Sequence, residues 1–169
     1  IQFARENQKP LLGICLGLQL ASIEFAKNVL GLSEATSAEL NPGSGEQIIH
    51  LMKDQEKVQQ KGGTMRLGAY PCRVKKGSKA HGLYKTEEAQ ERHRHRLEFN
   101  NQYRKQFEDK GVVFSGTSPD NELVEILEIN SHPWFIACQF HPELNSRPME
   151  AHPLFRGFIG KSWELKSHL

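Results

Sequence analysis

A cysteine lies between two glycines where an apolar strand is expected to turn into a helix. Residues 10–20 read Pro-Leu-Leu-Gly-Ile-Cys-Leu-Gly-Leu-Gln-Leu, so Cys15 is two residues away from both Gly13 and Gly17. This is the pattern of a nucleophile elbow, with a strained turn at the nucleophile and glycines where neighbouring backbone packs closely. The amides that begin the following helix should favour the thiolate. The segment therefore predicts a cysteine nucleophile for acyl transfer.

A nucleophilic cysteine needs a base, and His141 is the best placed of the eight histidines in the chain. It follows the apolar segment 134–140 and begins the tripeptide His141-Pro142-Glu143. Because Pro142 restricts the backbone to an extended form, His141 and Glu143 should face the same side, and Glu143 would orient the imidazole. Alone, this tripeptide is more often a turn after a strand. Together with Cys15 it predicts a Cys-His-Glu triad.

The apolar patterns predict the elements that position these residues. Strands and helices alternate in the first part of the chain, whereas the last part holds consecutive strands, which predicts a mixed sheet flanked by helices. The polar segment 53–63 is expected to be a surface loop. The expected strands are 11–14, 47–52, 64–74 (one strand, or two broken at Pro71), 92–99, 112–117, 123–129 and 134–140, and the expected helices are 16–30, 100–110 and one near the C-terminus.

Length and composition limit the possible classes of function. The 169 residues are enough for about one domain, and a net charge of +2 with interspersed signs implies no broad attraction to nucleic acid or membranes. Three widely spaced cysteines argue against a disulfide framework and favour a reducing, cytoplasmic compartment. We expect no metal site, because His93 and His95 have no further ligands at zinc-like spacing.

The motifs around Cys15 and His141 resemble those of the class I (triad) glutamine amidotransferase family. Further segments are similar to the glutaminase domains of the CTP synthase family, and the likeness covers essentially the whole chain. It implies a flavodoxin-like α/β fold with a mixed, mainly parallel central sheet, incomplete on its N-terminal side. The segments that carry it are Gly62-Gly63-Thr64-Met65-Arg66-Leu67-Gly68, Glu91-Arg92-His93-Arg94-His95-Arg96, Asn100-Asn101 and residues 132–148.

The resemblance implies a role for each candidate residue. Cys15 would be the nucleophile, His141 the base and Glu143 the residue that orients it. Free L-glutamine would be the substrate, and Arg suits its carboxylate because the guanidinium binds carboxylates in a bidentate manner. The implied glutamine-binding residues are Leu16 through its N–H, Gln19 near the bound substrate, Glu39 for the α-ammonium group and Arg96 for the α-carboxylate.

Each glutamine-binding residue also has an ordinary structural interpretation. Gln19 would otherwise be a solvated helix residue and Glu39 a surface charge in a loop. Arg96 would belong to a basic surface strand or a phosphate-contact patch. The sequence also departs from the family pattern beside two charged residues, with Leu40 after Glu39 and Leu144 after Glu143, where the family commonly has phenylalanine.

The resemblance further implies that ammonia from glutamine passes to a synthetase domain, which aminates ATP-activated UTP to CTP. ATP, Mg²⁺, UTP and a GTP activator are implied for that domain, and no cofactor is expected in this chain. The resemblance implies a homotetramer for the full enzyme, and filaments of it. The first residue, Ile1, looks like part of a helix already begun, so we expect a longer protein. The family's Gly-Gly-Phe-Gly oxyanion loop would precede it.

Two other interpretations stay open at this point. One is a different triad γ-glutamyl amidohydrolase, although a clamp for a free amino acid, Glu39 with Arg96, argues against long γ-glutamyl substrates. The other is a regulatory or assembly fragment that is catalytically impaired, because only Leu16 would then supply an oxyanion donor.

Overall fold

The computed structural model describes residues 1–43, 45–51 and 65–166. The expected loop at 53–63 lies outside these residues. Met52, from the expected strand 47–52, and Thr64, from the expected strand 64–74, also lie outside them. In chain order the elements are α1 (Gln2–Glu6), β1 (Leu11–Ile14), α2 (Leu16–Asn28), β2 (Ala35–Ser37), β3 (Glu46–Leu51), β4 (Arg66–Val74), α3 (Lys79–Tyr84), β5 (Glu88–His95), β6 (Leu97–Phe99), the 3₁₀ turn η1 (Asn101–Tyr103), α4 (Arg104–Asp109), β7 (Val112–Thr117), β8 (Val124–Ile129), β9 (Phe135–Cys138), the 3₁₀ turn η2 (Pro142–Leu144) and α5 (Pro153–Lys166).

The strands form two sheets, and the expected α/β class with a mixed sheet and flanking helices is confirmed. The six-stranded sheet has the order β1-β9-β8-β7-β4-β5, and a three-stranded sheet has the order β2-β3-β6. The expectation that the central sheet is mainly parallel is wrong for these strands. Within the described sheet β1 and β9 pair in parallel, whereas the other four neighbouring pairs are antiparallel. Short turns join β7, β8 and β9, and a parallel pair needs a crossover of about a dozen residues.

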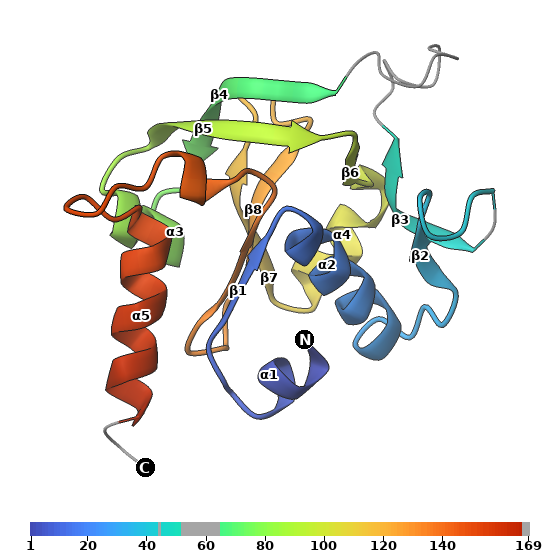
Figure 1. Ribbon diagram of the computed structural model, residues 1–169. Helices are drawn as coiled ribbons and strands as arrows, with labels where there is room; N and C mark the ends of the chain where they lie inside the picture. The colour runs from blue at the N-terminus through green and yellow to red at the C-terminus, as the bar shows by residue number, and fades with distance from the viewer. Residues whose placement is uncertain (44, 52–64, 167–169) are drawn as a thin grey trace.

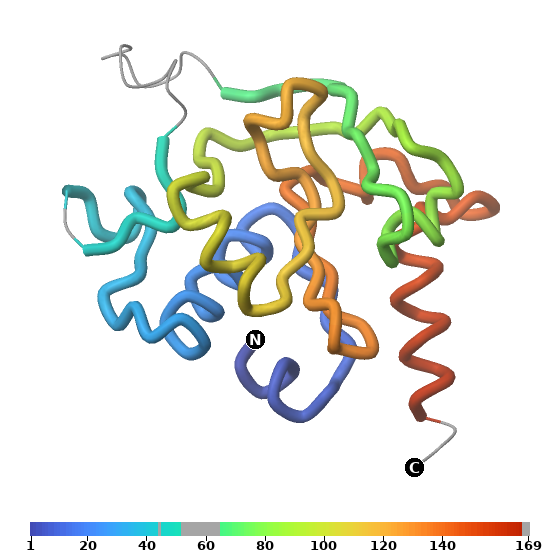
Figure 2. Tube along the Cα trace, turned by 180° about the vertical axis from the view of Figure 1, so that it is seen from behind, coloured from blue at the N-terminus to red at the C-terminus, as the bar shows by residue number. Residues whose placement is uncertain are grey.

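Helices cover both faces of the six-stranded sheet (Figure 1; Figure 2 gives the reverse view). Successive side chains of β8 and β9 alternate between two apolar clusters, so Leu127 and Ala137 pack with α2 and α4, whereas Ile126 and Ile136 pack with α3 and α5. Burial on both faces explains why β9 reads as a continuous apolar run. Among the described residues no helix has the length and apolar character that crossing a membrane would require.

The segment predicted as one strand over residues 92–99 is two strands in different sheets. β5 ends at His95 in the large sheet, and β6 begins at Leu97 in the small sheet. Arg96 is the single residue between them. β4 is continuous through Pro71, which pairs with Gln90 of β5. β4 meets β7 only near its end, so the missing N–H of Pro71 lies at a stretch where β4 has no second neighbour.

Close packing between β1, β9 and the start of α2 explains one of the two glycines beside Cys15. Gly13 pairs with Ala137 in the parallel ladder, and a Cβ on Gly13 would lie 2.9 Å from the Ala137 Cβ and from the Gly17 carbonyl group. The same expectation is wrong for Gly17, where an added Cβ meets nothing within 4 Å. Gly13 is therefore the residue that allows α2 to follow β1 directly.

We expect Gly13→Ala to destabilise the fold and Gly17→Ala to leave it intact. A forced contact in a packed interior typically costs about 1–3 kcal/mol, whereas alanine in a helix is favoured over glycine by up to about 1 kcal/mol. Thermal unfolding of the full-length protein with each substitution measures the difference. Equal melting temperatures for the two variants would contradict the steric role of Gly13.

Candidate active site

The parallel pairing of β1 with β9 brings the two halves of the predicted triad to one edge of the sheet. Ile14, at the end of β1, pairs with Cys138, at the end of β9, so both strands end together. Cys15 follows β1 immediately, and its N–H donates to the Cys138 carbonyl over 2.8 Å. His141 comes three residues after β9. Catalytic groups collect at such carboxyl ends in α/β sheets.

Cys15 occupies the strained backbone that the elbow pattern predicts. Its φ of 51° and ψ of −102° place it between strand and helix, in a region that residues other than glycine rarely adopt. It forms the N-cap of α2, and its carbonyl accepts from the N–H of Leu18 over 3.0 Å. The turn leaves the side chain half-buried and holds the sulfur beside the N–H of Leu16.

His141 and Glu143 lie in direct contact. The His141 Nδ1 is 2.6 Å from the Glu143 Oε1, and the His141 N–H donates to the Arg92 carbonyl over 2.8 Å. A carboxylate accepts, so Nδ1 carries the proton and Nε2 is left to act as the base. The contact is as predicted but its cause differs, because residues 142–144 form the 3₁₀ turn η2 and not an extended segment.

Burial decides the protonation state of the nucleophile at rest. Burial raises the pKa of the Cys15 thiol, while the N–H of Leu16 and the side-chain amide of Gln139 act in the opposite direction. The negative charges of Glu143 and Glu98 raise this pKa further. The expectation that the helix start alone favours the thiolate is therefore wrong in its net direction. The resting group is a thiol, which makes a base necessary.

A short chain of amides leads from the sulfur into the core. The Gln139 Nε2 donates to the Cys15 Sγ over 3.7 Å, and the Gln139 Oε1 accepts from the Gln19 Nε2 over 3.3 Å. The Gln19 Nε2 also donates to the Leu97 carbonyl over 3.4 Å. Gln19 is 4% exposed, so it is not the solvated helix residue of the ordinary interpretation. Sequence analysis missed Gln139, whose one signal is an amide inside the otherwise apolar segment 134–140.

Glu39 and Arg96 lie at one end of the small sheet. Glu39 follows β2, and Arg96 precedes β6, while β3 lies between them and pairs with both strands. Glu39 lies in the turn at 38–40 that follows β2, and Leu51 of β3 pairs with Leu97 of β6. Both charged side chains are exposed, contrary to the expectation of buried partners. Among the described residues neither forms an ion pair, so both charges remain available to a ligand.

The segment 92–96 is not simply a basic surface strand, because its two histidines point into the protein. His93 and His95 are 1% and 6% exposed, and the His93 Nδ1 is 2.8 Å from the His95 Nε2. The arginines on either side of them face solvent. The His93 Nε2 is 3.4 Å from the Glu125 Oε2, and the His95 Nδ1 is 3.4 Å from the Glu98 Oε1. Arg66 completes this buried cluster, with its guanidinium 2.6 Å from Glu125 and 3.8 Å from Glu98.

The contact with the Leu97 carbonyl shows which nitrogens of His93 and His95 carry a proton. The His95 Nδ1 lies 3.2 Å from this oxygen, and a carbonyl only accepts, so Nδ1 carries the proton. Burial lowers the pKa of His95 to about 4 and that of His93 to about 2, so both rings are neutral. The His93 Nδ1 must then donate to His95, which leaves the His93 Nε2 as an acceptor. This nitrogen faces the Glu125 carboxyl, whose Oε2 is 3.4 Å away.

The two carboxyl groups of the cluster, Glu125 and Glu98, both have raised pKa values. Burial raises the pKa of Glu125 to about 7 against the opposing effect of Arg66. Burial, followed by the charge of Glu125, raises the pKa of Glu98 to about 8 against the opposing effect of Arg66. The two carboxyls thus retain a proton near neutral pH beside the single guanidinium of Arg66. Among the described residues no group of three or more His, Cys, Asp or Glu side chains is arranged to hold a metal ion.

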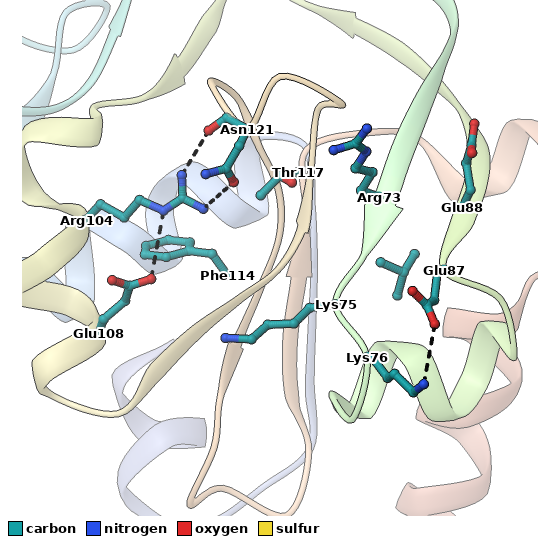
Figure 3. A pocket seen from close by; sticks show the side chains of 11 residues that line it. Arg73, Lys75, Lys76, Glu87, Glu88, Arg104, Glu108, Phe114, Thr117 and Asn121 are labelled. Carbon is teal, nitrogen blue, oxygen red and sulfur yellow. Dashed lines mark hydrogen bonds and ion pairs between the residues drawn. The ribbon is translucent and has the colours of Figure 1, made fainter.

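A surface pocket of about 620 Å³ lies between β4, β5, β7 and α4, apart from the elbow. Figure 3 shows that most of its charges are already paired. Arg104 donates to Asn121 over 3.0 Å and lies over the Phe114 ring, and Lys76 is 3.9 Å from Glu87. The described residues that line this pocket include none of the predicted site residues. It therefore contributes nothing to the chemistry of Cys15.

Comparison with known proteins agrees with this geometry. The family model of class-I glutamine amidotransferases matches residues 1–161. The CTP synthase of Aquifex aeolicus (strain VF5) is 58% identical over 166 residues, and that of Bacillus subtilis (strain 168) is 58% identical over 163 residues. These alignments cover 98% and 96% of this chain but 31% and 30% of the relatives. The chain thus spans about a third of the length of the curated relatives it matches.

A solved structure shows the same fold over nearly all of the chain. It is the glutaminase domain of Trypanosoma brucei CTPS with bound acivicin, and it superposes with a TM-score of 0.90 at 35% sequence identity. The match covers 96% of this chain and 63% of that chain. An identity above 25% together with this TM-score makes the resemblance more than a shared fold class.

The raised pKa of Glu125 predicts a specific pH dependence. A carboxyl whose folded-state pKa is raised stabilises the fold fully below its unfolded pKa of about 4.5, and this contribution is lost as the pH rises through about 7. We expect Glu125→Gln to remove that loss, because its amide can donate to His93 and accept from Arg66 as the protonated acid does. The difference between pH 6.5 and 8.5 should be about 1 kcal/mol.

Hydrogen–deuterium exchange of the peptides that cover β5 and β6 measures this local stability after correction for intrinsic exchange rates. The lowered pKa values of His93 and His95 affect stability mainly below about pH 7 and act equally in both proteins, and Glu98, with a pKa raised to about 8, titrates within this range in both. Glu122→Gln, at an exposed position, is the matched control and should behave as the wild type does. An unchanged pH dependence in Glu125→Gln would show that the proton resides elsewhere.

Proposed function

This chain belongs to the class-I glutamine amidotransferase family, and we propose that it is the glutaminase domain of a CTP synthase. In this proposal it hydrolyses L-glutamine to glutamate and ammonia through a γ-glutamyl thioester. The observation that carries the proposal is the placement of Cys15 and the His141–Glu143 pair at the ends of two neighbouring parallel strands. The similarity to CTP synthases over the whole chain supports the particular parent enzyme.

The first half-reaction forms the thioester. The His141 Nε2 accepts the thiol proton of Cys15, and the sulfur attacks the side-chain amide carbon of glutamine. The N–H of Leu16, at the start of α2, donates to the oxyanion that develops on the amide oxygen. The imidazolium, stabilised by Glu143, then protonates the leaving nitrogen. Ammonia departs and the γ-glutamyl group stays on the sulfur.

The second half-reaction returns the enzyme to its resting state. The neutral His141 ring takes a proton from water as the oxygen attacks the thioester carbon. The carbon–sulfur bond breaks, glutamate leaves and the sulfur of Cys15 recovers its proton from His141. Because burial favours the neutral thiol, the proton is available again for the next cycle.

Recognition of free glutamine is assigned to the charged pair at the end of the small sheet. Arg96 would bind the α-carboxylate and Glu39 the α-ammonium group, and both side chains are exposed and without an ion-pair partner among the described residues. Gln19 would act on the substrate side only through its contacts with Gln139 and Leu97, since its amide is buried.

The ammonia would serve an amidoligase in the same enzyme. We propose a synthetase domain that uses ATP and Mg²⁺ to activate UTP and aminates it to CTP, in a homotetramer of the full enzyme. The support for this is that the matching CTP synthases are about three times as long as the aligned region.

Substitution of the nucleophile tests the glutaminase assignment. In the full-length protein, Cys15→Ala should reduce glutamine-dependent CTP formation by at least about 10³-fold, because no thioester can form. CTP formation from added ammonium should be unchanged, which controls for folding and for the synthetase reaction. Ammonia release from glutamine that survives in Cys15→Ala would contradict the assignment.

Substitution of Arg96 tests substrate recognition separately. Arg96→Ala should raise the KM for glutamine by about 10- to 100-fold with little change in kcat, because it removes a charge-assisted contact made throughout the reaction. Arg94→Ala is the matched control, since Arg94 is also exposed and lies two residues earlier on β5. Steady-state kinetics with glutamine as the varied substrate give the comparison. An unchanged KM would remove Arg96 from the glutamine site.

A further inference from the structure

Gln139 has a contact that the proposed mechanism does not use. Its amide is fully buried on the segment between β9 and His141, and its Nε2 lies 3.7 Å from the reacting sulfur of Cys15. Its own backbone is fixed, because its N–H donates to the Glu125 carbonyl over 2.9 Å. An amide placed so close to a nucleophile either donates to it or opposes its ionisation, depending on which way the amide faces.

The Leu97 carbonyl decides which way this amide faces. It only accepts, so the Gln19 amide must present its NH₂ group to Leu97. The second hydrogen of that NH₂ group is directed at Gln139, which must therefore present its oxygen to Gln19. The NH₂ group of Gln139 is then the part that faces Cys15. Reversing any one amide would place two oxygens, or two NH₂ groups, against each other.

We propose that Gln139 is a further catalytic residue, whose amide N–H stabilises the Cys15 thiolate in a direction imposed by Leu97 through Gln19. The inference rests on the proposed function insofar as Cys15 is the nucleophile of a glutaminase. No atoms are transferred through the amides. As the proton of Cys15 moves to His141, the hydrogen bond from Gln139 strengthens because its acceptor becomes charged.

The opposing charges around the sulfur explain why such a donor matters. Glu143 from η2 and Glu98 from β6 both act against the thiolate, and burial acts in the same direction. The N–H groups of Leu16 and Gln139 are the contacts that favour it. Leu16 would also serve the oxyanion of the substrate, so Gln139 is the donor that stays with the sulfur throughout the cycle.

The titration of Cys15 tests the proposal independently of glutamine. The full-length protein is treated with iodoacetamide at pH 6 to 10, and alkylation of the Cys15 peptide is followed by mass spectrometry. In Gln139→Met the rate of Cys15 alkylation at pH 7 should fall about tenfold. The midpoint of the alkylation rate as a function of pH should move to higher pH by about one unit. Gln19→Met should shift the midpoint in the same direction by a smaller amount, since Gln139 is then free to reverse. Gln102→Met, on the exposed turn η1, is the control.

Kinetics separate this role from a purely structural one. Gln139→Met should lower kcat for glutamine hydrolysis about tenfold with little change in KM, whereas a displaced substrate site would raise KM. If the methionine variant does not fold, Gln139→Glu keeps the shape and replaces the donor by an acceptor, and the same upward shift is expected. A folded variant of either kind that titrates as the wild type does would overturn the proposal.

Failure of the proposed function would look different. If Cys15 were not the glutaminase nucleophile, Cys15→Ala would still release ammonia from glutamine, while the alkylation midpoint of Gln139→Met would still be shifted. If only the role of Gln139 were wrong, Cys15→Ala would be inactive and the midpoint would stay in place.

Discussion

The whole site depends on the parallel pairing of β1 with β9. The pair requires Gly13 to pack against Ala137, and it places Cys15 and His141 where both strands end. Antiparallel pairing would send one of the two residues to the opposite edge of the sheet. Groups from α2, β6 and η2 influence the pKa of the Cys15 thiol only because these elements pack around this one pair of strands. The antiparallel strands β8, β7 and β4 extend the sheet but supply no residue of the triad.

A second constraint is the single buried oxygen of Leu97. It accepts from Gln19 on one side and lies beside His95 on the other, so two hydrogen-bonded chains begin at the same acceptor. One chain ends with an N–H directed at Cys15, and the other ends at the Glu125 carboxyl. Gln139 also donates its backbone N–H to the Glu125 carbonyl, so both chains involve residue 125, one through its backbone and the other through its carboxyl group. Leu97 directly follows Arg96. The carbonyl that orients the hydrogen bonds of both chains therefore lies next to the residue proposed to bind the α-carboxylate of glutamine.

Sequence reasoning succeeded where the information is local. The apolar runs of β1, β7 and β9, and the existence of a helix around α4, follow from patterns a few residues long. Cys15, His141 and Glu143 could be proposed because nucleophile, base and carboxylate have distinctive residue types. The strand directions were misjudged even though the short turns between β7, β8 and β9 imply hairpins. The division of 92–99 at Arg96 depends on the pairing of β6 with β3, which no local pattern reveals.

The missed residue, Gln139, and the buried position of the predicted Gln19 depend on contacts between distant parts of the chain. Gln139 meets Cys15 across 124 positions, and Gln19 meets Gln139 across 120, so their hydrogen bonds cannot be read from spacing. The misjudged protonation of Cys15 has a related cause. A helix N-terminus contributes roughly 0.3–1 kcal/mol to a nearby charge, whereas desolvation of a buried charge costs several times more. The fold therefore keeps a neutral thiol at rest, which is less open to oxidation than a thiolate, and leaves ionisation to His141 and the aligned donors.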